Sequence, residues 1–195
     1  MTALTLKSYQ QSALDALATY ARAARVKGPA AAFAEHAGRA YNADAFGPDV
    51  PCVCLRIPTG GGKTVLAAHA VPLLAAEWRG TDAPVAVWLV PSDTIRTQTL
   101  KALQTSGHPY REALEAVYGL GLRVCSLDDV AQVPAPQWGR QAVVIVVATI
   151  QSFRIDDAGQ RNVYSFTEAF EPHFKYALAQ GKGAEGGRDL ACLHA

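Results

Sequence analysis

The pattern of apolar and polar positions divides the chain into helical and extended segments. Apolar residues recur at helical spacing over residues 7–26, and Gly28-Pro29 follows, so the pattern predicts a helix that ends there. The members of this apolar face are Leu14, Leu17, Ala21 and Ala24. Further helices are expected over residues 30–40, 63–79 with a kink at Pro72, 94–105, 110–118 and 167–179.

Short apolar runs lie between these helical segments. The runs are VCLRI (53–57), VAVWLVP (85–91), RVCSL (123–127) and AVVIVVATI (142–150). The second is continuous, which is typical of a strand buried on both faces, and the last consists almost wholly of β-branched residues and alanine. Because these strands alternate with helices, the chain is expected to form an α/β fold with a parallel sheet.

Composition restricts the function classes. The 195 residues are 50% hydrophobic with a formal net charge of +1, which fits one domain with a packed core and gives no overall attraction to nucleic acid. The first residues, MTALTLKSYQ, lack the pattern of a signal peptide, and no apolar run is long enough to cross a bilayer. We therefore expect a cytoplasmic protein without a membrane role.

The cysteines do not follow the spacing of a disulfide framework or a zinc site. Cys52 and Cys54 alternate on what the pattern predicts to be a buried strand, and Cys125 and Cys192 are isolated. All four are expected to be free thiols that pack as small hydrophobic side chains. His69 is expected to be packed or partly exposed on the helix over 63–79.

The segment 58-PTGGGKT-64 carries the clearest chemistry. A predicted strand, a glycine-rich turn, Lys-Thr and a helix form the arrangement that phosphate binding requires, because backbone N–H groups and the helix N-terminus then face the anion. Lys63 is expected near the β- and γ-phosphates of ATP, and the Thr64 hydroxyl on Mg²⁺. Ile57 replaces the first glycine of the general pattern, which favours a helicase-type loop. The expected nucleotide-binding residues of the loop are Thr59, Gly60, Gly61, Gly62, Lys63 and Thr64.

Four segments in order carry a family resemblance. They are 6-LKSYQQSAL-14, 57-IPTGGGKT-64, 89-LVPSDTIRTQT-99 and 146-VVATIQSF-153. With them the chain resembles the superfamily 2 helicases, and more narrowly the helicase subunit of type III restriction enzymes. The resemblance implies a P-loop NTPase fold with a RecA-like parallel sheet flanked by helices. It also implies an ATP- and Mg²⁺-dependent motor on double-stranded DNA, with a methyltransferase or specificity subunit as a further partner.

The resemblance assigns a role to the first segment. Gln10 would recognise adenine, since an amide both donates and accepts as adenine N6 and N7 require; the alternative is an exposed Gln at a helix start. Tyr9 would pack beside the base or lie in the core, and the core is favoured.

The third and fourth segments would contact the nucleic-acid backbone. Ser92 and Thr94 follow one buried strand, and Thr149 and Gln151 end another. The alternatives are that Ser92 or Asp93 caps the following helix and that the second pair only terminates its strand. A modest basic rim, or simply solvated surface charge, is expected from Arg96, Lys101 and Arg154.

A motor of this kind also needs an Asp-Glu pair after an apolar strand, to hold Mg²⁺ and to activate water. The sequence has no such pair: Asp128-Asp129 follows a weak strand, and Asp156-Asp157 lies in an expected loop. We therefore expect the N-terminal part of a first RecA-like lobe, without the Walker B strand or a second lobe. Such a chain would bind ATP and DNA but would not hydrolyse ATP alone, and its open sheet edges would make it poorly stable.

The expected organisation has three parts. They are a helical segment with the adenine-recognition motif (1–49), a partial RecA-like ATP-binding lobe (50–160), and a helix with a flexible Gly-rich tail (161–195). Two alternatives remain: a non-catalytic nucleotide-binding regulatory module, and a different P-loop enzyme such as a small-molecule kinase.

Overall fold

The computed structural model describes residues 5–42, 47–133 and 142–153. The helix predicted over 167–179 and the Gly-rich tail lie outside these residues, as do Cys192, Arg154 and Asp156-Asp157. The described residues of Met1–Asp82 and Ser106–Gly119 form one compact unit, and those of Ala83–Thr105 and Leu120–Ala195 form a second. The domain boundaries expected from the sequence stay a prediction.

The first unit is built from helices. They are α1 (Ser8–Lys27), α2 (Pro29–Ala37), α3 (Lys63–Leu74) and α5 (Pro109–Tyr118). The predicted apolar face of α1 is buried, which confirms the helical spacing seen in the sequence. Proline at the first position of α2 and of α5 suits a helix start, where its missing N–H has no intrahelical partner to lose. α1 contacts α2 and α3, and α3 contacts α5.

The helix predicted over 63–79 is α-helical only in its first part. The α-helix ends at Leu74, and Ala75–Arg79 (η1) forms a π-helix whose cap N–H, at Gly80, donates to the Ala75 carbonyl. Pro72 lies just upstream and cannot donate to the preceding turn. The α-helix therefore ends earlier than predicted, and a kink at Pro72 stays a prediction.

The prediction of a strand over residues 53–57 is wrong. The described structure has no strand in this segment, and Val53 and Leu55 are each 38% exposed. An apolar run forms a strand only where an edge is present to pair with its backbone, and the sequence pattern does not reveal that partner. The expected burial of Cys52 and Cys54 is also wrong, since the first is half-buried and the second exposed.

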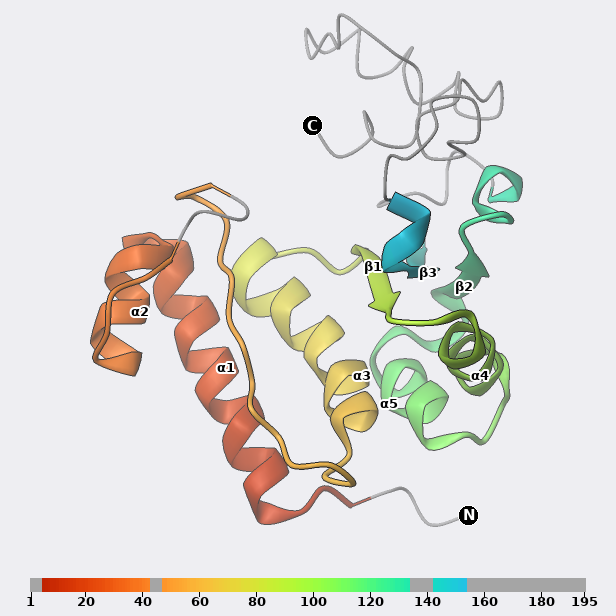
Figure 1. The fold of residues 1–195 in the computed structure, drawn as a ribbon, viewed down its shortest axis with the longest axis horizontal. Helices are drawn as coiled ribbons and strands as arrows, with labels where there is room; N and C mark the ends of the chain where they lie inside the picture. The colour runs from red at the N-terminus through yellow and green to blue at the C-terminus, as the bar shows by residue number, and fades with distance from the viewer. Residues whose placement is uncertain (1–4, 43–46, 134–141, 154–195) are drawn as a thin grey trace, which may run out of the picture. The chain divides into compact units, whose positions relative to one another are not determined.

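Three packed aromatic rings anchor the segment that leads from α2 to the glycine-rich loop. Tyr20 meets Phe33 edge-on at 6.0 Å between centroids, and Phe33 meets Tyr41 at 5.5 Å. The Tyr41 hydroxyl donates to the Val50 carbonyl (2.5 Å) and accepts from the Cys52 N–H (2.6 Å). From there the extended segment returns toward the N-terminal end of α1, where α3 begins (Figure 1).

The second unit contains a parallel sheet. In the described residues it has three strands in the order β1-β3-β2, namely β1 (Val85–Val90), β2 (Leu122–Ser126) and β3 (Val143–Thr149). Helix α4 (Asp93–Gln104) contacts all three strands (Figure 1). The α/β fold class with a parallel sheet is therefore confirmed.

Burial differs between the centre and the edge of this sheet. β3 lies where the β-branched run predicted a strand, and every one of its residues is buried. β1 pairs with β3 on one side, and its Val87 and Leu89 are 43% and 49% exposed. The prediction that β1 is buried on both faces is wrong, because a continuous apolar run does not distinguish a central strand from an edge strand. In β2, burial raises the pKa of the Cys125 thiol to about 11, with the Asp129 carboxylate adding to the effect.

No helix in the described part of the chain is both long and apolar enough to cross a membrane.

Candidate functional site

The glycine-rich loop is a tight turn that leads directly into α3. The Gly61 N–H donates to the Pro58 carbonyl at 3.0 Å, and Gly60 and Gly62 adopt φ angles of 76° and 78°. These angles lie in the left-handed region that side chains with a Cβ rarely adopt. The sequence therefore supplies glycine where the backbone needs it.

Two of the glycines also occupy confined positions. A Cβ on Gly61 would lie 2.6 Å from Ile57 Cγ2 and 2.9 Å from the Pro58 oxygen, and one on Gly62 would lie 2.5 Å from Gln10 Nε2. Such distances are well inside van der Waals contact. Neither position therefore accommodates a larger residue without rearrangement.

The start of α3 is open to an anion. Its N-cap is Gly62, no side chain caps it, and its first turn contains no acidic residue. The free N–H groups and the helix dipole therefore favour a negative ligand at this end. Lys63 and Thr64 are the first two residues of the helix, and Lys63 Nζ donates to the Pro58 carbonyl at 3.0 Å.

Gln10 and Tyr9 connect the start of α1 to the loop. Gln10 Oε1 accepts from the Lys7 N–H (2.9 Å), and its Nε2 donates to the Gly61 carbonyl (3.0 Å). The Tyr9 hydroxyl donates to the same carbonyl at 3.0 Å. Gln10 is 7% exposed, so the alternative of an exposed Gln is wrong. Tyr9 is 40% exposed, so its expected place in the core is wrong too.

A triphosphate with Mg²⁺ fits these residues. The glycines allow the tight turn that leads into α3, and the uncapped helix start supplies N–H donors. Lys63 would hold phosphate oxygens and Thr64 would offer its hydroxyl to the metal. The Pro58 carbonyl accepts from both the Gly61 N–H and Lys63 Nζ, so Lys63 would leave this carbonyl to hold a phosphate.

His69 lies two turns further along α3 and is half-buried. Burial lowers the pKa of its imidazole. The expected packed or partly exposed position is therefore confirmed. No group of three or more metal-binding side chains occurs in the described ranges.

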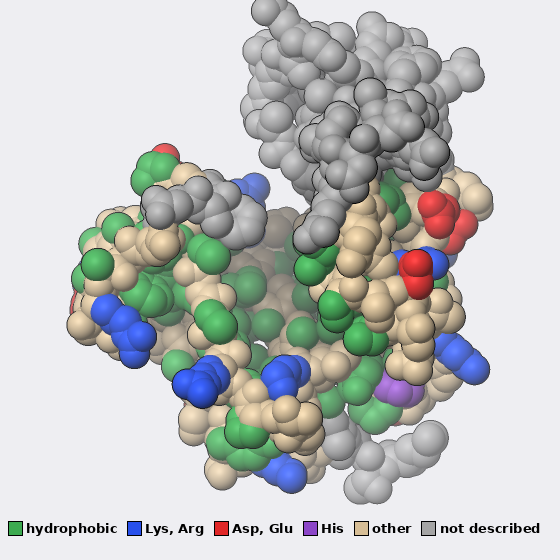
Figure 2. Space-filling view, viewed as in Figure 1, with side chains coloured by type: hydrophobic (Ala, Val, Ile, Leu, Met, Phe, Trp, Pro, Cys, Tyr) green, Lys and Arg blue, Asp and Glu red, His purple; other side chains and the backbone are tan. Residues whose placement is uncertain are grey.

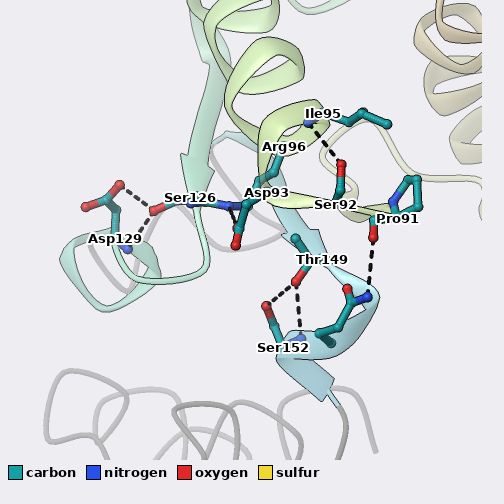
Figure 3. Close-up of polar contacts among 10 residues, drawn as sticks. Pro91, Ser92, Asp93, Ile95, Arg96, Ser126, Asp129, Thr149 and Ser152 are labelled. Carbon is teal, nitrogen blue, oxygen red and sulfur yellow. Dashed lines mark hydrogen bonds and ion pairs between the residues drawn. The ribbon is translucent and has the colours of Figure 1, made fainter.

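In the second unit, the carboxyl ends of β1 and β3 meet. Val90 is paired with Thr149, so the segments that follow the two strands lie together. The Gln151 Nε2 donates to the Pro91 carbonyl at 3.3 Å and joins these segments (Figure 3). The predicted nucleic-acid residues are thus brought to one edge of the sheet.

The individual side chains at this edge differ in exposure. Ser92 caps α4, its Oγ accepting from the Ile95 N–H at 3.4 Å, which confirms the capping alternative. Thr94 and Gln151 are exposed. Thr149 is 6% exposed, and its hydroxyl bonds with the Ser152 hydroxyl at 2.9 Å and accepts from the Ser152 N–H (Figure 3). Thr149 therefore supports the turn and does not face solvent.

One ion pair and one hydrogen bond join polar side chains at this edge. Arg96 Nε lies 2.9 Å from an Asp93 oxygen, and the Ser126 hydroxyl donates to Asp129 at 2.6 Å at the end of β2 (Figure 3). Lys101 is exposed on α4. Figure 2 shows Lys and Arg side chains of the described residues in blue, among hydrophobic and other surface. Of the expected basic rim, Arg96 is paired with Asp93 and Arg154 lies outside the described residues, so the rim stays a prediction.

One comparison with known proteins gives a match. The model of the family described as type III restriction enzyme, res subunit, matches residues 3–176. The chain belongs to this family. No curated protein and no solved structure matched it.

Membership of the res-subunit family implies an ATP-dependent, helicase-type function in general terms. It supports the helicase interpretation over that of a small-molecule kinase. The matched residues include the glycine-rich loop, the Tyr9-Gln10 segment and the sheet edge. The roles of the individual residues stay predictions.

Sequence reasoning did not find how the loop is held. The bond from Tyr9 to Gly61 spans 52 positions, and no local pattern marks such a pair. The Ser126–Asp129 turn was also missed. A serine followed three residues later by an acid after a strand is a signal for a turn of this kind.

Proposed function

We propose that residues 58–64 bind the triphosphate of ATP with Mg²⁺ as part of a DNA helicase or translocase of the type III restriction class. The observation that carries the proposal is the uncapped start of α3, with Lys63 and Thr64 immediately after a turn that only glycine fits. Family membership supports ATP as the ligand.

Gln10 is proposed to contact the adenine base. An amide has two N–H donors and two acceptor lone pairs. Within the described residues, Gln10 donates one N–H to the Gly61 carbonyl and accepts one hydrogen bond from the Lys7 N–H. The remaining donor and lone pair match what adenine N7 and N6 require.

The experiment that tests the nucleotide site is Lys63→Ala. Lys63 is exposed and its ammonium donates to a backbone carbonyl of the loop, so the fold should persist. We expect ATP affinity, measured by calorimetry with Mg²⁺, to fall below detection while far-UV circular dichroism is unchanged. Lys101→Ala is the matched control, since Lys101 is exposed on α4. Unaltered ATP affinity in Lys63→Ala refutes the assignment.

The sheet edge is proposed to bind the backbone of double-stranded DNA through exposed neutral groups. Thr94 and Gln151 are exposed there, and the first residues of α4 add N–H donors. Ser92 would contribute while it caps the helix, and Thr149 would hold the turn. Thr94→Ala should weaken DNA binding without loss of stability, and Thr97→Ala, also exposed on α4, should change neither property. Equal DNA affinity in both variants would exclude this role of the edge.

Hydrolysis is proposed to depend on an acid pair that this sequence does not contain. Purified protein is then expected to bind ATP without releasing phosphate above background. Steady phosphate release that is lost in Lys63→Ala would contradict this proposal. A methyltransferase or specificity subunit is proposed as a partner on family membership alone.

A further inference from the structure

The Gly61 carbonyl accepts two hydrogen bonds from the start of α1. Tyr9 Oη and Gln10 Nε2 both lie 3.0 Å from this oxygen. A carbonyl oxygen has two lone pairs, so the two donors account for its full capacity. The donors come from consecutive residues whose helix packs against α3.

The two hydrogen bonds to the Gly61 carbonyl also fix the direction of the Gly62 N–H, which belongs to the same peptide group. The described chain has no cis peptide bonds, and in a planar trans peptide the C=O and the N–H point in opposite directions. Holding the Gly61 oxygen toward α1 therefore directs the Gly62 N–H away from α1. Gly62 is the N-cap of α3, so this N–H belongs to the group of donors at the open helix end.

We infer that Tyr9 is a positioning residue of the phosphate site. Its hydroxyl keeps the peptide between Gly61 and Gly62 oriented so that the Gly62 N–H faces a bound triphosphate. The inference rests on the proposed ATP-binding function, and it differs from a base contact because it acts on the phosphates alone. The partial exposure of Tyr9 fits this role, since the ring is not needed to fill the core.

Tyr9→Phe tests the inference because it removes one oxygen atom and keeps the ring. We expect the affinities for Mg²⁺-ATP and for Mg²⁺-tripolyphosphate to fall by the same factor, roughly five-fold, as for the loss of one hydrogen bond. The Gly62 amide ¹⁵N and ¹H shifts should also move in the ligand-free protein. The melting temperature should stay close to that of the unaltered protein, as expected for a residue that is not in the core.

The control is Tyr118→Phe. The Tyr118 hydroxyl is buried and has no hydrogen-bond partner in the described structure, and α5 lies in the same unit. This variant should leave both affinities and the Gly62 shifts unchanged.

The outcomes distinguish a failure of the positioning role of Tyr9 from a failure of the proposed ATP site. If the unaltered protein binds both ligands and Tyr9→Phe changes neither affinity, the positioning role is refuted and the ATP site stands. A loss confined to ATP would instead make Tyr9 a base contact and overturn the inference. If the unaltered protein binds neither ligand, the proposed function fails, and the positioning role fails with it.

Discussion

Gln10 occupies the space that a side chain on Gly62 would need. The ideal Cβ position of Gly62 lies 2.5 Å from Gln10 Nε2, the same nitrogen that donates to the Gly61 carbonyl. The start of α1 and the start of α3 therefore pack closely at Gln10 Nε2. A substitution at either residue is expected to disturb the loop.

Gly62→Ala and Gly60→Ala form a matched pair for this contact. Both positions have φ in the left-handed region, at 78° and 76°, but a Cβ at Gly60 meets nothing within 4 Å. The backbone strain of about 1–2 kcal/mol should be common to both variants. Gly62→Ala should lose additional stability in urea unfolding, and it should lose triphosphate binding. Equal unfolding free energies in the two variants would show that Gln10 moves aside at no cost.

Gln10→Ala should weaken ATP more than tripolyphosphate. Gln10 is proposed to contact both the base and the loop, so its loss removes a base contact that tripolyphosphate never makes. Calorimetric titration of both ligands gives the ratio of the two losses. Gln11→Ala is the control, since Gln11 is exposed and its amide bonds to Asp15 on the same helix. Equal losses for both ligands in Gln10→Ala would remove the adenine role and leave Gln10 as a support of the loop.

Thr149→Val should destabilise the second unit. Valine keeps the shape of the buried side chain but removes the hydroxyl that bonds to Ser152, leaving the Ser152 N–H without this acceptor. The expected cost is about 1 kcal/mol, measured by urea unfolding. Thr97→Val, at an exposed position of α4, should cost less. A stability equal to that of the unaltered protein would mean that the turn after β3 does not depend on Thr149.

The stability of the first unit should fall in mildly acidic solution because of His69. Burial lowers the pKa of His69 below its ordinary value of 6.5. Below pH 6.5 the unfolded chain therefore binds a proton that the folded chain does not, so stability is lost as the pH falls toward the folded pKa. Above this window His69 contributes no pH dependence.

Thermal melts of His69→Gln across this window provide the measurement. The variant should lose less stability on acidification than the unaltered protein. His36→Gln is the control because His36 is exposed on α2. If the acid response of His69→Gln matches that of the unaltered protein, another group is responsible.

The sequence by itself determined the local features of this protein. Helical spacing located α1 together with the face that it buries. The β-branched run over 142–150 located the strand β3, because β-branched side chains pack well on a pleated sheet. The glycine triplet with Lys63 and Thr64 marked the turn and the helix start, since these depend on backbone freedom at consecutive residues. The order of the four segments was enough to indicate the family that the comparison then showed.

Only the tertiary structure decided which segments of the chain pair or pack with one another. The apolar run over 53–57 forms no strand in the described residues, and β1 lies at an edge with Val87 and Leu89 exposed. Both outcomes depend on the presence of a neighbouring strand, which no local pattern encodes. The bonds from Tyr9 and Gln10 to Gly61 join residues 52 and 51 positions apart. They exist because the packing of α1 against α3 brings the start of one helix to the start of the other.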